Sequence, residues 1–335
     1  MKLKFAIETL MRHEELDTIT CQESFDEIMR EECSPLQTAA FLALLRAKPE
    51  TAGEITSIID FFKTKMISVA TPHVTLDIVG TGGDGAHTVN ISTGSALVAA
   101  ICGIKIAKHG NRAVSSRAGS ADVLETLGVN IQLSPEKVSA LIDQCGFGFC
   151  HAPHFHPGLL KLKTLRRELN LPTTLNLLGP LLNPAHASHY LLGVLNEPLA
   201  LVMAKVLQQI GTPRSIVIHG CGLDELSTIG VATILEVTPT EIKSSRLDPR
   251  EFGFAPSSHQ DLRGGDASTN AALLRHSFEG KKGAVSDALI LNAAVALNIY
   301  GLHASLPEAI EHAREALYGG ATLRLLHQLI ELSHD

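Results

Sequence analysis

The first 65 residues carry apolar side chains at the spacing of α-helices. Between residues 34 and 48 the apolar positions are Leu36, Ala40, Phe41, Leu44 and Leu45. Ser34 is placed to cap this helix, and Pro35 suits its first turn. A second helix is expected from about Thr51 to Lys65, with one apolar face formed by Ile55, Ile58, Ile59 and Phe62. These faces predict packing within a small helical domain or at a dimer interface, and the pattern alone does not distinguish the two.

The pattern changes at Val74, where short apolar runs ending in polar or glycine-rich loops begin to alternate with helical segments. The runs that predict buried strands are residues 74–80, 104–111 and 214–220. The segments that predict helices are residues 92–102, 120–128 and 288–301. This alternation predicts an α/β domain with a mostly parallel central sheet flanked by helices.

The composition is that of a globular protein with two domains. The chain has 335 residues, 45% of them hydrophobic and 19% charged, which is longer than a single core usually accommodates. The formal net charge of −7 disfavours nonspecific binding to nucleic acid. The sequence predicts neither a membrane helix nor a signal peptide. The six cysteines form no CxxC pair, so we expect reduced, buried thiols and a cytoplasmic location.

A glycine-rich loop follows the first predicted strand. Its sequence is GTGGDG, from Gly80 to Gly85, and glycines allow backbone N–H groups to converge on an anion. The segment NISTGS, from Asn90 to Ser95, brings hydroxyl and amide groups to the start of the next helix. An ordinary turn explains the first motif alone, and N-capping by Ser92 or Thr93 explains the second. The two motifs together favour a phosphate-binding cradle.

Polar residues also follow the second predicted strand. KHGNR begins at Lys108 and SSRAGSAD ends at Asp122. Ligands bind at the carboxyl ends of the strands in such sheets, so Lys108 and Arg112 are candidates to neutralise phosphate. Asn111 is a candidate to orient a ligand, and Ser120 to donate to a phosphate. Solvated surface charge is the alternative for a single Lys or Arg, but a polar burst after an apolar strand favours a site.

Two further segments carry candidate chemistry. Asp224 and Glu225 follow the strand that ends at Gly220, and Mg²⁺ favours a few carboxylates together with substrate phosphates. The alternative for this acidic pair is the start of a helix, where acidic residues are favourable in any case. Arg166 and Arg167 are adjacent on a predicted helix and so point to different faces; one of them suits a planar carboxylate.

These motifs, in this order, resemble the anthranilate phosphoribosyltransferase family. The resemblance rests on GTGGDG, NIST, KHGNR, SSRAGSADVLETLG, HP, LGPLLNP, HGCGLDE, GGDASTNA and LNAAVAL, and it covers nearly the whole chain. It implies a helical domain over residues 1–70 that takes in a later segment at about 160–185. Residues 73–160 and 186–335 would then form the larger α/β domain. It also implies a homodimer through the helical domain, bound Mg²⁺, and a possible glutamine amidotransferase component of anthranilate synthase as a partner.

The resemblance implies that this family transfers the phosphoribosyl group of PRPP to anthranilate in tryptophan biosynthesis. The residues that it assigns to PRPP are Gly80, Thr81, Gly82, Gly83, Asp84, Thr88, Asn90, Ser92, Thr93, Lys108 and Ser120. The residues that it assigns to anthranilate are Gly80, His109, Asn111, His156, Arg166, Gly179 and Pro180. The residues that it assigns to Mg²⁺ are Ser92, Asp224 and Glu225. No residue is assigned as a general base.

Six positions depart from the usual family pattern, several of them near the acceptor segment, namely Val89, Ala118, Gly158, Leu159, Pro172 and Leu175. A related phosphoribosyltransferase or nucleoside phosphorylase with a nucleobase acceptor would carry similar phosphate loops. Arg166 and the KHGNR motif favour a carboxylate acceptor over a nucleobase. A non-catalytic relative that binds nucleic acid would have a basic surface, contrary to the net charge of −7.

Overall fold

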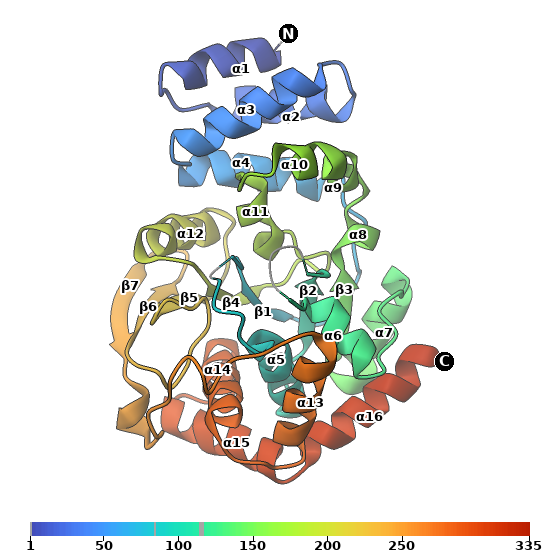
Figure 1. Cartoon of the computed structure of the whole chain (residues 1–335), viewed down its shortest axis with the longest axis vertical. Coiled ribbons are helices and arrows are strands. Elements are labelled where there is room, and N and C mark those ends of the chain that lie inside the picture. Colours follow the sequence, from blue (N-terminus) through green and yellow to red (C-terminus); the bar gives the residue numbers. More distant parts are fainter. Residues whose placement is uncertain (1, 84, 114–116) are drawn as a thin grey trace. The chain divides into compact units, whose positions relative to one another are not determined.

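The computed structural model describes residues 2–83, 85–113 and 117–335 and divides the chain into two compact units (Figure 1). The helical unit comprises Met1–Ile67 and Pro153–Leu182. The α/β unit comprises Ser68–Ala152 and Asn183–Asp335. The return of the chain to the helical unit spans residues 153–182, whereas the sequence analysis placed it at about 160–185.

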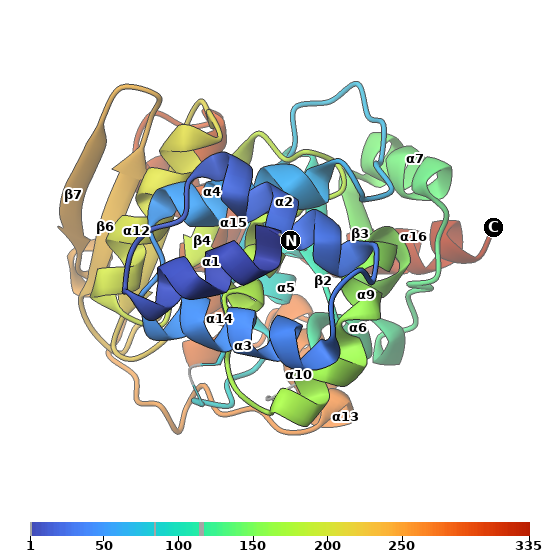
Figure 2. The ribbon, with the colours of Figure 1, turned by 90° about the horizontal axis from the view of Figure 1, so that it is seen from above.

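The helical unit begins with four helices, which Figure 2 shows from above. They are α1 (Lys2–Met11), α2 (Thr18–Met29), α3 (Pro35–Ala47) and α4 (Ala52–Lys63). The returning segment adds short helices, α8 (Ala152–Phe155), α9 (Pro157–Lys161), α10 (Lys163–Leu169), α11 (Leu175–Leu178) and the 3₁₀-helix η1 (Gly179–Leu181). Thr174 ties this segment to the first helices, because its hydroxyl donates to the Glu50 carboxylate at 2.8 Å.

Local signals set the beginnings of α3 and α4. Ser34 caps α3 in a capping box with Gln37, which confirms the predicted N-cap. Thr51 forms the same motif with Glu54 at α4. The Glu54 side chain is fully buried and also accepts from Lys48 Nζ at 2.8 Å, so this buried acid is paired. The core between the helices is aromatic, with the ring of Phe25 5.4 Å from that of Phe41.

The α/β unit is built on one seven-stranded sheet in the order β3-β2-β1-β4-β5-β6-β7. The five parallel strands are β1 (Leu76–Gly80), β2 (Ile106–Gly110), β3 (Phe147–His151), β4 (His189–Gly193) and β5 (Ser215–Gly220). The two antiparallel strands are β6 (Ala232–Val237) and β7 (Ile242–Leu247), which form one edge in Figure 2. The predicted fold class, a small helical domain followed by a mostly parallel α/β domain, is confirmed.

Helices from both the early and the late parts of this unit cover the sheet. The helices of this unit are α5 (Ile91–Ile101), α6 (Ser120–Thr126), α7 (Pro135–Cys145), α12 (Glu197–Gln209), the 3₁₀-helix η2 (Pro249–Phe252), α13 (Ala267–Phe278), α14 (Ala284–Tyr300), α15 (Leu306–Tyr318) and α16 (Ala321–His334). The apolar helix α5 contacts β1, β2 and α14, which lie beside it in Figure 1. Because both faces of the central strands are covered, β1 and β4 are buried along most of their length rather than at alternate positions.

The structure bears on two expectations from the sequence, the absence of a membrane helix and the state of the cysteines. Within the part of the chain that the structure describes, no helix is both long and apolar enough to span a membrane. All six cysteines are free, as expected, but Cys33 and Cys221 are half-exposed, so only four of the thiols are buried.

Candidate active site

Four neighbouring parallel strands each end in a glycine at the same edge of the sheet. They are β1 at Gly80, β2 at Gly110, β4 at Gly193 and β5 at Gly220. Gly80 lies directly opposite Gly193, and the Thr81 N–H donates to the Gly193 carbonyl at 2.9 Å. A glycine at these ends lets other chain segments pass close to the backbone. The polar loops predicted from the sequence therefore converge on one edge, as expected for a ligand site in such a sheet.

Asp224 reaches the glycine-rich loop from a distant part of the chain. Its Oδ2 accepts a hydrogen bond from the Gly82 N–H at 2.7 Å. A Cβ atom on Gly80 would collide with the Asp224 carboxylate, and one on Gly193 would collide with the Asp224 carbonyl. Gly82 itself has φ +67°, a conformation that favours glycine. The next glycine, Gly83, is exposed, and the predicted site residue Asp84 lies outside the described residues.

Glu225 reaches the start of α5. Its Oε1 accepts from the Ser92 N–H at 2.8 Å, so a carboxylate lies at the N-terminus of the helix that follows the glycine loop. The alternative that Asp224 and Glu225 begin a helix is wrong, because the chain forms turns there and continues into β6. N-capping by Ser92 or Thr93 is also wrong: the N-cap is Asn90, and its side chain makes no capping bond. Ser92 and Thr93 lie inside the helix, which starts at Ile91, and Glu225 takes the Ser92 N–H that the Asn90 side chain would otherwise bond.

Lys108 lies beneath the loops rather than at their surface. Only 2% of the residue is exposed, and its Nζ donates to the Ile78 carbonyl at 2.7 Å and to Ser92 Oγ at 3.4 Å. Burial lowers the pKa of Lys108, while the carboxylates of Asp77 and Glu225 act to raise it. The carboxylates of Asp77 and Glu225 thus lie near one buried ammonium beneath the glycine-rich loop.

Asp77 is the buried partner of this lysine. Burial raises the pKa of its carboxyl to about 6, although the nearby positive charge of Lys108 acts to lower it. Asp77 Oδ2 accepts from the Asn183 side chain at 2.7 Å and from the His109 N–H at 3.2 Å. The Asp77 carboxylate therefore fixes the His109 backbone and the Asn183 side chain, and Asn183, in the LGPLLNP motif, also donates to the Ala107 carbonyl at 2.6 Å.

The segment after β2 is clipped by Asp122. Its Oδ2 accepts from the Ala113 N–H at 2.8 Å and from the Gly119 N–H at 2.9 Å, so one oxygen holds both ends of the segment. Arg112 donates to Asp122 at 3.0 Å and to Glu125 at 2.7 Å. The Arg112 charge is thus compensated within the protein, contrary to the idea that it serves phosphate.

The remaining residues assigned to PRPP surround this edge. The backbone of Thr88 forms an isolated antiparallel β-bridge with that of Arg263. Asn111 is exposed, and Ser120 Oγ donates to the Asn111 carbonyl at 3.5 Å. The hydroxyl groups of Thr81 and Thr93 are less accessible to a ligand than the motif suggested. Both of their hydroxyl oxygens are buried without a hydrogen-bond partner among the described residues, and Thr93 is fully buried in α5.

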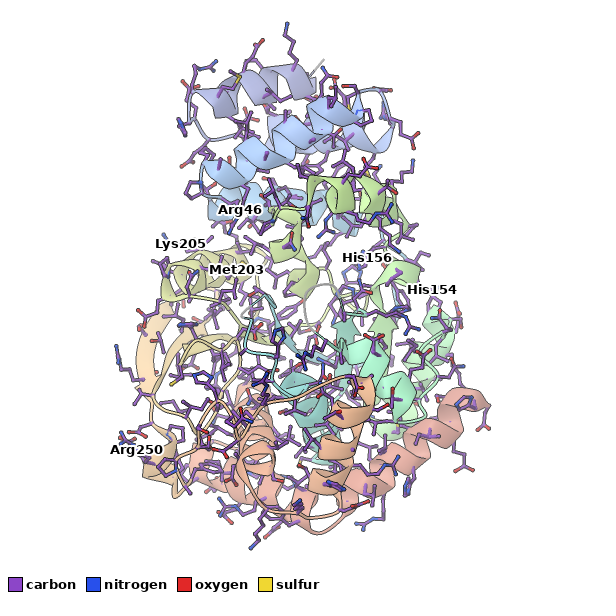
Figure 3. All side chains as sticks on the ribbon, viewed as in Figure 1. Arg46, His154, His156, Met203, Lys205 and Arg250 are labelled. Atoms are coloured by element: carbon purple, nitrogen blue, oxygen red, sulfur yellow. The ribbon has the colours of Figure 1, made fainter. Side chains whose placement is uncertain are left out.

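Four of the residues assigned to anthranilate belong to the helical unit. His156 precedes α9, close in sequence to His154 (Figure 3), and burial lowers its pKa to about 4. Arg166 is half-buried on α10 whereas Arg167 is exposed, as the adjacent positions predicted. Burial lowers the pKa of Arg166, which stays charged because guanidinium is so strongly basic. Gly179 and Pro180 form η1.

Several residues that shape the site carried no role in the sequence analysis. Asp77 was a single acidic residue in an apolar strand, and that contrast was the available signal. Asn183, Asn270 and Asn292 stood inside recognised motifs. Asn292 on α14 accepts from the Leu226 N–H at 3.2 Å and donates to the Leu226 carbonyl at 2.8 Å, which fixes the residue next to Glu225. Gly193 carried no signal, because its importance comes from the distant Asp224.

Comparisons with known proteins account for both units. Residues 72–323 match the model of the glycosyl transferase family, a/b domain. Residues 4–64 match the model of the glycosyl transferase family, helical bundle domain. The anthranilate phosphoribosyltransferase of Chlamydia felis is 46% identical over 314 residues, which cover 93% of this chain and 92% of that relative. The chain belongs to the anthranilate phosphoribosyltransferase family.

Solved structures of this family share the fold over the full length. The anthranilate phosphoribosyltransferase of Thermus thermophilus superposes with a TM-score of 0.93 at 38% identity, covering 98% of this chain and 99% of that chain. The Saccharomyces cerevisiae enzyme in complex with PRPP and Mg superposes with a TM-score of 0.92 at 29% identity, covering 99% and 98%. The resemblance stated from the sequence motifs is therefore confirmed at the level of the family.

Proposed function

We propose that this enzyme transfers the 5-phosphoribosyl group of PRPP to the amino group of anthranilate, giving N-(5-phosphoribosyl)anthranilate and pyrophosphate in tryptophan biosynthesis. The observation that carries the proposal is similarity over almost the whole chain to relatives named anthranilate phosphoribosyltransferase. Family members have been solved with PRPP and Mg and with 4-fluoroanthranilate. The converging loops supply the matching chemistry, N–H donors for phosphate and carboxylates for a cation.

The donor site in this proposal is the edge formed by the ends of β1, β2 and β4. The phosphates bind against the glycine-rich loop of Gly80–Gly83 and the N-terminus of α5. The N–H groups of Thr81, Gly82 and Ser92 already bond the Gly193 carbonyl, Asp224 and Glu225, so the remaining N–H groups of these two segments are the phosphate donors. Asn90 and Ser120 border the same edge, and the Lys108 ammonium contributes a fixed positive charge from below. Such preorganised donors stabilise the charge that develops on departing pyrophosphate without reorganising during the reaction.

The residues present fit Mg²⁺. Asp224, Glu225 and the Ser92 hydroxyl are oxygen donors, the class that Mg²⁺ prefers. In the described parts of the chain no three acidic, histidine or cysteine side chains cluster as a complete metal cage. An incomplete set suits Mg²⁺, which takes substrate phosphates and waters as its other ligands. The chemistry that bound Mg²⁺ supplies here is neutralisation of phosphate charge on the leaving group.

The acceptor residues in this proposal lie largely in the helical unit. Arg166 binds the anthranilate carboxylate, because its planar guanidinium can donate two parallel hydrogen bonds. The residues that line the path are His109, Asn111, His156, Gly179 and Pro180. The aryl amine has a free lone pair and attacks C1 of the ribose as pyrophosphate leaves, through a transition state with oxocarbenium character. The nitrogen of the product then releases one proton, for which no acceptor is assigned. Holding both substrates in place supplies much of the rate.

The deciding experiment follows the fluorescence of anthranilate after it is mixed with enzyme, PRPP and Mg²⁺. The chain contains no tryptophan, so protein emission does not mask the signal. A decay that requires PRPP and is stopped by EDTA supports the acceptor, the donor and the metal together. Unchanged fluorescence, with PRPP binding still detected by calorimetry, would refute anthranilate as the acceptor and direct the search to nucleobases.

The oligomeric state that we propose is a homodimer through the helical unit. Four large apolar side chains on its first helices are exposed, namely Phe5 at 54%, Met11 at 65%, Ile19 at 67% and Leu36 at 83%. Exposed apolar side chains that gather into one patch mark interfaces, and the family resemblance implies pairing through this unit. Closed twofold dimers are the commonest oligomers of soluble proteins.

A further inference from the structure

The GGDASTNA motif contains an asparagine that the proposed chemistry does not use. Asn270 lies in the first turn of α13, and only 1% of it is exposed. Its Oδ1 accepts from the Gly265 N–H at 2.7 Å, and its Nδ2 donates to Asn90 Oδ1 at 2.8 Å. Both ends of one buried carboxamide are therefore bonded, and one end reaches a residue of the donor site.

Asn90 passes the connection on. Its Nδ2 donates to the Ala118 carbonyl at 3.2 Å. The two carboxamides thus form a chain that begins at a backbone N–H, that of Gly265, and ends at a backbone carbonyl, that of Ala118. A donor at one end and an acceptor at the other allow a single orientation of both amides. Asn90 makes no capping bond to α5, so the hydrogen bonds of its side chain are those to Asn270 and Ala118.

The segment that carries Asn270 is itself anchored behind the glycine loop. The Val89 N–H donates to the Leu262 carbonyl at 3.0 Å, and the Gly264 N–H donates to the His87 carbonyl at 2.9 Å. Gly264 approaches so closely that a Cβ atom there would lie 2.8 Å from the Thr88 carbonyl oxygen. Asn270 therefore acts from a fixed support, and the position of Asn90 depends on residues 180 positions further along the chain.

We propose that Asn270 is a positioning residue of the donor site: it orients the Asn90 carboxamide and, through it, holds the Ala118 carbonyl at a fixed distance from the start of α5. Asn270 does not touch substrate. It sets the separation between the two segments that flank the phosphates, the one before α5 and the one before α6. The assignment to PRPP rests on the proposed function, whereas the series of hydrogen bonds from Gly265 through Asn270 and Asn90 to Ala118 does not.

The first test measures the chain of hydrogen bonds without any substrate. Trypsin can cut after the exposed Arg117, at the bond next to the held carbonyl of Ala118. Asn270→Ala removes both hydrogen bonds of the carboxamide, of which the one to Asn90 supports the Ala118 carbonyl. We expect cleavage after Arg117 to rise about threefold to tenfold, the equivalent of this one buried hydrogen bond. Cleavage after Arg250 (Figure 3), which is exposed in η2, should not change. An equal rise at both sites would mean general destabilisation and overturn the proposal.

Two further variants separate orientation from volume. Asn270→Asp keeps the shape but places an acceptor against Asn90 Oδ1, so it should also release Ala118. The matched control is Asn298→Asp on α14, whose side chain bonds Arg214 at the amino end of β5, far from the glycine ends. Asn270→Asp that cleaves like the wild type would contradict the required orientation of the amide.

The second test asks whether Asn270 acts through Asn90. PRPP binding is measured by calorimetry with Mg²⁺ for Asn270→Ala, Asn90→Ala and the double variant. We expect Asn270→Ala to weaken PRPP binding about threefold to tenfold, and to have no further effect once Asn90 is alanine. Additive effects would overturn the proposal. If the wild type binds PRPP but consumes no anthranilate, the proposed acceptor fails while both tests of Asn270 remain valid.

Discussion

Gly193 and Asp224 form the tightest approach in the donor site. The main chain of Asp224 crosses β4 where Gly193 has no Cβ, and any side chain there would displace the Asp224 carbonyl. We expect Gly193→Ala to move the neighbouring carboxylates and lower turnover about a hundredfold, the usual consequence of a misplacement near 1 Å. Steady-state kinetics with PRPP and Mg²⁺ measure this loss. The control is Gly53→Ala in α4, where a new Cβ meets only Thr51 Oγ1 at 3.9 Å; equal activity of the two variants would contradict the argument.

Arg166 and Arg167 offer a matched pair on α10. Arg166 is half-buried, Arg167 is exposed, and among the described residues no carboxylate forms an ion pair with Arg166. Its guanidinium is thus free to meet the carboxylate of a substrate. We expect Arg166→Ala to raise the KM for anthranilate about tenfold to a hundredfold, since it removes a charge-assisted hydrogen bond. Arg167→Ala should behave like the wild type. A change confined to the KM for PRPP would show that the assignment is wrong.

The residue scale also shows the limits of what the sequence predicts. Ser34 and Pro35 were found as helix signals because a cap depends on neighbours three residues away. The same reasoning failed for Ser92 and Thr93, because the helix already starts at Ile91. Glu225, 133 residues away, takes the Ser92 N–H that a side-chain cap at Asn90 would have taken. Lys108 was found as a candidate but not as a buried one, since its depth depends on Asp77 and Ile78 on another strand.

At the scale of elements, one residue that bonds the N-terminus of α5 has both a structural role and a proposed chemical role. Glu225 bonds the Ser92 N–H and is also a proposed Mg²⁺ ligand. Glu225→Gln separates the two roles, because the amide oxygen still accepts from Ser92 while the charge is lost. We expect turnover to fall about a hundredfold or more. The melting temperature should change by less than about 4 °C, as for the loss of at most 1 kcal/mol in a domain of this size.

Two measurements check this prediction. Thermal unfolding reports the helix cap, and turnover against Mg²⁺ concentration reports the metal role. Glu225→Ala loses both roles and should unfold at a lower temperature than Glu225→Gln. Activity of Glu225→Gln equal to the wild type at saturating substrates would refute the assignment of Glu225 to the metal.

The elements themselves were largely predictable, and their pairing was not. Residues 74–80, 104–111 and 214–220 were expected as strands and contain β1, β2 and β5. Their apolar runs are read directly from the sequence, because buried parallel strands leave a continuous pattern. The pairing of β1 with β4 and the antiparallel edge of β6 and β7 come from tertiary packing. The polar β7 gives no such signal, since four of its six residues are exposed.

At the scale of the whole molecule, the chain interleaves its two units, and the resemblance anticipated this where local pattern could not. The chain leaves the helical unit after Ile67 and returns at Pro153. Residues 153–182 are short helices with no strong apolar period, so only long-range contacts such as Thr174 with Glu50 assign them. The proposed donor and acceptor residues are thereby divided between units that fold around separate cores. Lys48 and Glu54 form a buried ion pair within the helical unit, and removal of either partner would leave a buried charge unpaired.

The homodimer is the last expectation to test, and it concerns the helical unit. Leu36 is 83% exposed on α3, a large loss of apolar burial for a monomer. We expect sedimentation of the wild type to give twice the chain mass of 35.8 kDa. Leu36→Glu should shift the particle to the monomer mass, because a charge buried in an apolar interface costs several kcal/mol.

Leu201 provides the control for this prediction, because it is 48% exposed on α12 of the α/β unit. Leu201→Glu makes the same change in charge and volume and should leave the particle dimeric. A monomeric wild type would refute the dimer outright. A dimer that is lost in Leu201→Glu but persists in Leu36→Glu would place the interface on the α/β unit instead. Since each unit buries its own core, the monomer of Leu36→Glu should stay folded, which circular dichroism at the same concentration checks.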